Sequence, residues 1–148
     1  MNSTTFLEHR QLFYPILALI ILKFVVLIRL ASLRVTSVLT RKIKIGYFRG
    51  FGEVADIPAA MTYASRNFIN LFEMPVLFYI VLIFTLLFNQ VDEQTISFAW
   101  CFVAFRYIHS LIHITYNNVN HRFMAFVGSN IFLIVLIIRL TLALSKVA

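Results

Sequence analysis

Four long apolar runs, separated by polar segments, dominate the pattern of this chain. Each run is about 20 residues long, which is the length that an α-helix needs to cross a hydrocarbon core about 30 Å thick. Helices are expected because lipid offers no partner to exposed backbone N–H and C=O groups. The pattern therefore predicts an all-α integral membrane protein, a bundle of four transmembrane helices over residues 12–31, 68–88, 96–116 and 123–144.

The three connecting segments differ in length and charge. Residues 32–65 form a long basic segment, in which glycines and Pro58 disfavour a continuous helix. The segment 89–95 is short and acidic, whereas 117–122 is short and ends in Arg122. Because basic loops stay in the cytoplasm, the first and third segments are predicted to be cytoplasmic. The small set of loops is typical of a bacterial inner membrane protein.

Composition supports the same class of protein. Of the 148 residues, 61% are hydrophobic and 13% are charged, whereas about a quarter of a soluble protein is charged. We expect one membrane domain over residues 1–148, with no appended soluble enzyme. The net charge of +7 is concentrated in one loop, so membrane topology explains it better than nucleic acid does. The expected partner is therefore the lipid bilayer, and nucleic acid is not expected.

Polar side chains occur inside two of the apolar runs, where charges are costly and usually functional. In the second run, Arg66, Asn70 and Glu73 follow the spacing i, i+4, i+7, which places them on one face of a helix. Arg66 is expected at the cytoplasmic mouth, with Glu73 about 10 Å deeper.

The third run carries a similar stripe of Arg106, His109, His113 and Tyr116. Helices joined by a short loop are usually antiparallel neighbours, so the two stripes are predicted to face each other. We expect Glu73 to pair with Arg106, because such a pair would neutralise two charges that are each costly in lipid.

Together the two stripes predict a polar cleft that opens to the cytoplasm, with Arg122 at its rim. Three arginines (Arg66, Arg106 and Arg122) outnumber Glu73, so the cleft should attract an anion. A simpler interpretation is that the polar groups only hold the helices together. His109 and a histidine one turn later could share a metal ion, but the arginines would repel a cation, and no metal is expected.

Lys23 and Arg139 are further cations within the runs. Lys23 is near the middle of the first run, where it could extend to the membrane surface or pair with Glu73. Arg139 lies a few residues from the far surface and is expected to extend to it.

The two motifs resemble those of the MAPEG family, the membrane-associated proteins of eicosanoid and glutathione metabolism. The run R-x-x-x-N-x-x-E at Arg66 is similar to that of the family's second helix. Arg106, followed by His109 three residues later and Arg122 sixteen residues later, repeats a spacing found in the third helix of the family. The resemblance implies a homotrimer that binds glutathione in a cleft between subunits, near the cytoplasmic side.

The resemblance also implies roles for individual residues. The expected contacts of glutathione are Arg66, Asn70, Glu73, His109 and Arg122, with Arg106 supporting Glu73. An arginine near the end of a neighbour's first helix, either Arg34 or Arg29, would join them. His113 stands where the family has a tyrosine, and Tyr116 could substitute for it.

By the resemblance, the function is that of a glutathione transferase or peroxidase acting on a small lipophilic substrate. Arg122 would hold the thiolate, which is the nucleophilic form of the sulfur. Phe123 stands where some relatives have a serine implicated in chemistry, so prostaglandin isomerisation is not expected. The alternatives are a small proton-coupled transporter, in which Glu73 would bind proton and cation in turn, and a catalytically silent MAPEG-like protein.

Overall fold

The computed structural model describes residues 3–50 and 57–146, and these residues form helices joined by short connections. The helices are α1 (Ser3–Leu39), α2 (Tyr47–Gly50), α3 (Ala59–Asn70), α4 (Met74–Leu87), α5 (Glu93–Ile114) and α6 (Val119–Ser145). Four segments are long and apolar enough to cross a membrane, and α3 and α4 together make up one of them. The predicted four-helix membrane fold is thus confirmed.

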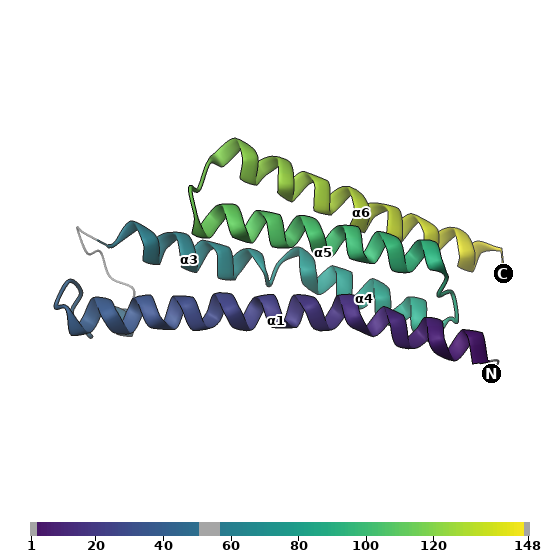
Figure 1. Ribbon diagram of the computed structural model, residues 1–148, viewed down its shortest axis with the longest axis horizontal. Coiled ribbons are helices and arrows are strands. Elements are labelled where there is room, and N and C mark those ends of the chain that lie inside the picture. Colours follow the sequence, from purple (N-terminus) through teal and green to yellow (C-terminus); the bar gives the residue numbers. More distant parts are fainter. Residues whose placement is uncertain (1–2, 51–56, 147–148) are drawn as a thin grey trace.

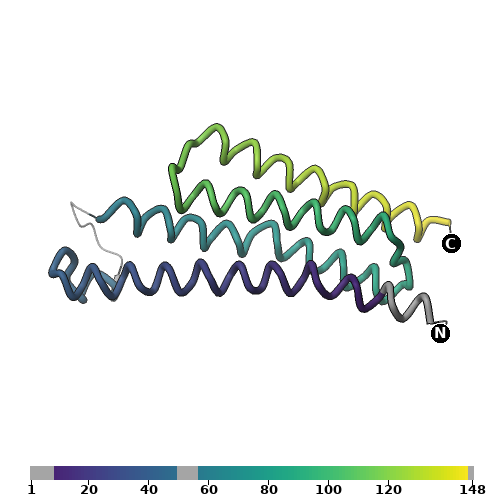
Figure 2. Tube along the Cα trace, in the orientation of Figure 1, coloured from purple at the N-terminus to yellow at the C-terminus, as the bar shows by residue number. Residues whose placement is uncertain are grey.

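The four spanning segments lie side by side in an elongated bundle (Figure 1). Both ends of the chain lie at the same end of the bundle as the α4–α5 connection (Figures 1 and 2). The α5–α6 connection and the turn after α1 lie toward the opposite end, which we call the α5–α6 end. α5 packs most extensively against α6, while α1 packs against both α3 and α5.

The predicted loop over residues 32–65 is too long, because helices extend into it from both sides. α1 continues to Leu39, since its apolar residues continue through Val35 and beyond. α3 already begins at Ala59, because Pro58 stands just before it, where a missing N–H costs no hydrogen bond. Residues 51–56 of the predicted loop lie outside the described residues.

The second span is broken, and the prediction of one continuous helix over residues 68–88 is wrong. α3 ends at Asn70 and α4 begins at Met74. Pro75 explains the break, because it has no N–H to donate to the carbonyl of Leu71 four residues earlier. Glu73 precedes α4 with φ −82° and ψ −92°, which is not helical. Asn70 and Glu73 therefore do not share the face of one regular helix.

Polar side chains begin the last two helices. The Asp92 carboxylate accepts a hydrogen bond from the Thr95 backbone N–H at 2.7 Å and so caps α5. The Asn118 side chain accepts from the N–H groups of Asn120 and His121 and so caps α6. The left-handed Asn117, with φ 48°, turns the chain between α5 and α6. These caps fix where α5 and α6 start.

The core is apolar and tightly packed between the helices. Phe78 of α4 stacks on Phe102 of α5, with ring centroids 4.3 Å apart. α5 approaches α6 closely at Gly128, where an added Cβ would come within 2.6 Å of the Phe105 ring. Small residues at such crossings allow spanning helices to pack closely. Large apolar side chains also cover the outside of the bundle, as expected of a surface that faces lipid.

Candidate functional site

The polar stripe of α5 points into the bundle. Arg106, His109 and His113 are 0%, 3% and 2% exposed, respectively. The Arg106 guanidinium donates through Nη2 to the main-chain oxygen of Asn70, the last residue of α3. Arg106 therefore satisfies a carbonyl that the helix break leaves without a helical donor. The predicted contact between the two polar stripes exists, but it is made with the backbone of α3.

The predicted ion pair between Glu73 and Arg106 is absent. Among the described residues, the one ion pair within 4.0 Å joins Asp92 to Arg139. The break turns Glu73 outward, so that its side chain is exposed. The prediction failed because it assumed a continuous helix, on which Glu73 would have faced α5.

The link between α3 and α5 includes two residues that the sequence analysis missed. Ser110 donates from its hydroxyl to Oδ1 of Asn67 at 2.9 Å, and both side chains are buried. Asn67 lies three residues before Asn70, and Ser110 lies four residues after Arg106, so helical spacing could have revealed both. The adjacent Arg66, which drew attention in the sequence, has an exposed side chain.

His109 and Arg122 connect α5 to the first turn of α6. The Nδ1 atom of His109 is hydrogen-bonded to the main-chain oxygen of Arg122 at 2.9 Å. The Arg122 side chain is half-buried, and its Nη1 donates to Oδ1 of Asn117 at 2.7 Å. This is the one hydrogen bond that its guanidinium makes to the described residues, so most of its donors are free for a ligand.

His113 lies beside a pocket of about 240 Å³ between α1, α3 and α5. Neither of its ring nitrogens has a hydrogen-bond partner within the described part of the chain. Arg29 and Tyr63 line the same pocket, and Arg29 donates to the main-chain oxygen of Ile114 at 3.2 Å. A buried imidazole without partners is costly, and both nitrogens of this ring are shielded from solvent.

Positive charge converges on the two histidines at the α5–α6 end. Arg106 lies three residues before His109 on α5, and the main-chain oxygen of Arg122 is hydrogen-bonded to His109. Two of the three arginines predicted from the sequence, Arg106 and Arg122, therefore lie beside the histidines, whereas Arg66 is exposed and lines a different pocket. Such an arrangement favours the binding of an anion.

Arg34 lies on the other side of α3. It lines a second pocket of about 240 Å³ together with Arg66, and its guanidinium carbon is 5.8 Å from the centre of the Phe48 ring. Arg29 and Arg34 thus line two different pockets, one on each side of α3.

Tyr116 does not join the buried cluster. Its side chain is 61% exposed, and its hydroxyl is hydrogen-bonded to Nδ1 of His121 at 3.0 Å. The phenol therefore lies at the rim of the α5–α6 end.

Lys23 has a different environment from either of those predicted. Its ammonium lies over the rings of Phe72 and Tyr79, 4.4 and 4.7 Å from their centres. Two aromatic faces partly replace the water that the charge loses in the span. Lys23 and Glu73 of the chain do not form an ion pair.

Fold and site together define a class of protein, a multi-pass α-helical membrane protein with a cation-rich polar cluster inside its spans. Within residues 3–50 and 57–146, no group of three or more His, Cys, Asp or Glu side chains could hold a metal ion. The MAPEG family model matches residues 12–142, and the chain belongs to this family, which acts in eicosanoid and glutathione metabolism. No curated protein and no solved structure matches the chain.

Proposed function

We propose that the protein is a glutathione-dependent membrane enzyme of the transferase or peroxidase class, acting on lipophilic electrophiles. One observation carries the proposal. In a chain of the MAPEG family, Arg106 and Arg122 lie beside two buried histidines whose ring nitrogens include three without partners among the described residues.

The residues at this end fit the chemistry of glutathione, which carries two carboxylates and one ammonium. Arg66 and Arg122 have donors suited to carboxylates. Glu73 is exposed and can accept hydrogen bonds from an ammonium, while the Asn70 amide, also near the break, can both donate and accept. Either Arg29 or Arg34 would add a further donor.

Bound glutathione would supply a thiolate nucleophile. Attack on an electrophilic carbon would form a C–S bond and displace the leaving group. Attack on a peroxide oxygen would break the O–O bond, leaving a sulfenic acid on glutathione and releasing an alcohol once the alkoxide takes up a proton. Arg122 would stabilise the negative charge on the thiolate sulfur. Its hydrogen bond to Asn117 restricts the guanidinium, so less conformational entropy is lost when a ligand binds. The lipophilic substrate would enter from the bilayer, along the apolar outer face of the bundle.

A homotrimer is part of the proposal. Glu73 lies within a span and is exposed on the single chain, where lipid would be a costly neighbour for its charge. A second copy packed over the break would cover it. We also propose a bacterial inner membrane with the connection between α1 and α3 in the cytoplasm, because basic residues gather there.

Calorimetric titration of the purified protein with glutathione tests the proposal. The wild-type protein is expected to bind at millimolar glutathione, and Arg122→Ala should weaken binding about tenfold or more, as loss of a charged hydrogen bond does. Arg10→Ala, an exposed arginine toward the other end, is the matched control and should bind like the wild type. Absence of wild-type binding at millimolar glutathione would reject the proposal.

Turnover is measured separately, with an electrophilic aryl halide and a lipid hydroperoxide as substrates. Product formation that depends on Arg122 supports an enzyme. Glutathione binding without turnover of either substrate would instead favour a family member that has lost its chemistry.

A further inference from the structure

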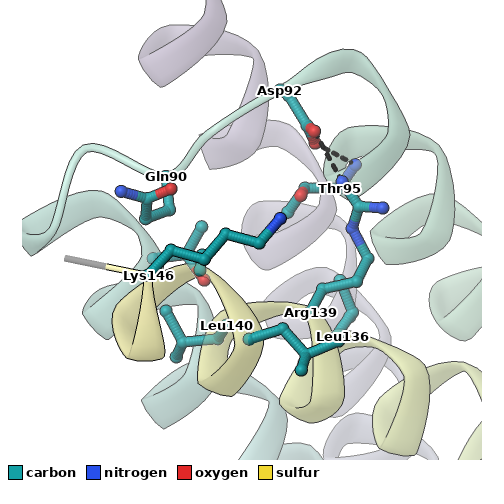
Figure 3. A pocket seen from close by; sticks show the side chains of 10 residues that line it. Gln90, Asp92, Thr95, Leu136, Arg139, Leu140 and Lys146 are labelled. Carbon is teal, nitrogen blue, oxygen red and sulfur yellow. Dashed lines mark hydrogen bonds and ion pairs between the residues drawn. The ribbon is translucent and has the colours of Figure 1, made fainter. Parts of the chain in front are cut away.

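A second polar site lies at the end of the bundle opposite the α5–α6 end (Figure 1), and Figure 3 shows it from close by. It is a cavity of about 260 Å³ where α4, α5 and α6 meet. We call it the terminal pocket. Its polar lining comes from Thr85, Gln90, Asp92, Thr95, Arg139 and Lys146.

Arg139 is held rigidly at one side of the terminal pocket. Its Nη2 pairs with the Asp92 carboxylate, and its Nη1 donates to Oε1 of Gln94 at 2.6 Å. Its Nε is buried and has no hydrogen-bond partner within the part of the chain that the structure describes. The pair neutralises the negative charge of Asp92 and leaves one buried N–H donor unused.

Lys146 supplies the net positive charge of the pocket. Figure 3 shows its side chain extending across the pocket toward Thr95. Among the described residues, its ammonium has no hydrogen-bond or ion-pair partner. With Asp92 compensated by Arg139, the ammonium of Lys146 makes the terminal pocket attractive to an anion.

The rest of the pocket lining is apolar. It consists of aliphatic side chains of α6, namely Leu136, Leu140, Leu142 and Ala143. The pocket lies at the ends of three spanning segments, where headgroups meet acyl chains. A ligand that fits both parts of the lining has an anionic group joined to an apolar chain.

We propose that the terminal pocket binds the phosphate of an anionic phospholipid, with Lys146 as the main cationic contact and the α6 wall against the start of an acyl chain. The chemistry recognised is a phosphate group, which either a lipid or free phosphate could offer. The apolar wall favours the lipid. This site does not depend on the proposed glutathione site at the α5–α6 end.

Thermal unfolding in neutral detergent micelles tests the proposal, with phosphatidylglycerol, phosphatidylcholine or inorganic phosphate titrated in. Phosphatidylglycerol should raise Tm of the wild-type protein more than phosphatidylcholine does. Lys146→Gln should weaken the apparent affinity for phosphatidylglycerol about fivefold, the effect of one lysine beside an anionic headgroup. Lys146→Arg should retain most of the affinity.

Lys44→Gln is the matched control, because Lys44 is exposed in the connection after α1, at the opposite end of the bundle. It should respond to phosphatidylglycerol like the wild type. Equal losses in Lys44→Gln and Lys146→Gln would overturn the proposal, since general charge attraction would then explain the binding. If inorganic phosphate raises Tm as much as phosphatidylglycerol does, the proposal that the ligand is a lipid is wrong.

Discussion

The guanidinium of Arg106 donates a hydrogen bond to the main-chain oxygen of Asn70, across the interface between α5 and α3. Asn70 is the last residue of α3, and the break that follows leaves its carbonyl without a helical donor. A fully buried cation thus stabilises the interruption of a membrane-spanning helix. Arg106 also lies three residues before His109 on α5, so it joins the polar stripe of α5 to the break.

Replacing Arg106 should therefore destabilise the fold. In Arg106→Leu the Asn70 carbonyl loses its donor, and an unsatisfied buried group costs about 1–3 kcal/mol. We expect a lower Tm in detergent, measured by circular dichroism. Arg10→Leu, at an exposed position of α1, should leave Tm unchanged. A Tm of Arg106→Leu equal to that of the wild type would show that this hydrogen bond does not stabilise the break.

The buried contact between Asn67 and Ser110 should show energetic coupling. A double-mutant cycle of Asn67→Ala and Ser110→Ala is expected to give an interaction free energy of about 0.6 kcal/mol and at most about 1.7 kcal/mol. These are the values found for other polar contacts between membrane helices. The measurement is the free energy of unfolding in mixed micelles. Strictly additive effects of the two substitutions would contradict a direct hydrogen bond.

The crossing of α5 and α6 at Gly128 should not tolerate a larger side chain. Gly128→Val would place its Cβ within 2.6 Å of a Phe105 ring carbon, so either the ring or a helix must move. Overpacking of this kind typically costs about 1–3 kcal/mol, and Tm should fall.

Gly46→Val serves as the control for this substitution, because an added Cβ at Gly46 meets no atom of the described residues within 4 Å. Its Tm should match that of the wild type. If Gly46→Val destabilises the protein as much as Gly128→Val does, helix packing at Gly128 is not the cause.

Asp92 contributes as a helix cap and as the partner of Arg139. Asp92→Ala loses both roles and should cost about 1 kcal/mol for the cap alone. Asp92→Asn keeps a capping oxygen and loses only the charge, which is worth less than about 1 kcal/mol near a surface. The free energy of unfolding, measured by chemical denaturation, should therefore be lower for Asp92→Ala than for Asp92→Asn. The reverse order would contradict the cap.

The charge of Asp92 should make stability depend on pH. Burial raises the pKa of this carboxyl, but hydrogen bonds from Thr95 and the nearby Arg139 guanidinium outweigh burial, so the pKa lies below its ordinary value of 3.8. A lowered folded pKa stabilises the fold above the ordinary value, and this contribution is lost as pH falls through the folded pKa. The Tm advantage of the wild type over Asp92→Asn should therefore be full at neutral pH, begin to decline near about pH 4, and vanish only when the pH is below the folded pKa.

Much of the fold follows from hydrophobic length, because four runs of about 20 apolar residues leave few alternatives in lipid. The break at residues 71–73 was missed, although Pro75 indicates it. Apolar runs do not reveal where a backbone hydrogen bond is lost, and the carbonyl of Asn70 takes its donor from a residue 36 positions away. The boundaries of α1 and α3 were missed for a related reason, since the basic residues beyond Ala31 remain compatible with helix.

The candidate site was predicted in part. The inward direction of Arg106, His109 and His113 follows from helical spacing, and the structure places all three in the interior. The outward turn of Glu73 depends on the break, so spacing alone gave the wrong direction. The exposure of Tyr116 depends on the end of α5 at Ile114, a boundary that apolar length does not fix.

The hydrogen bond between His109 and Arg122 also determines where the imidazole proton resides. A carbonyl oxygen can only accept, so Nδ1 carries the hydrogen and, in the neutral ring, Nε2 presents its lone pair. That lone pair is buried and unpaired among the described residues. In this tautomer Nε2 can accept a hydrogen bond, and a donor could reach it only if the surrounding helices moved apart.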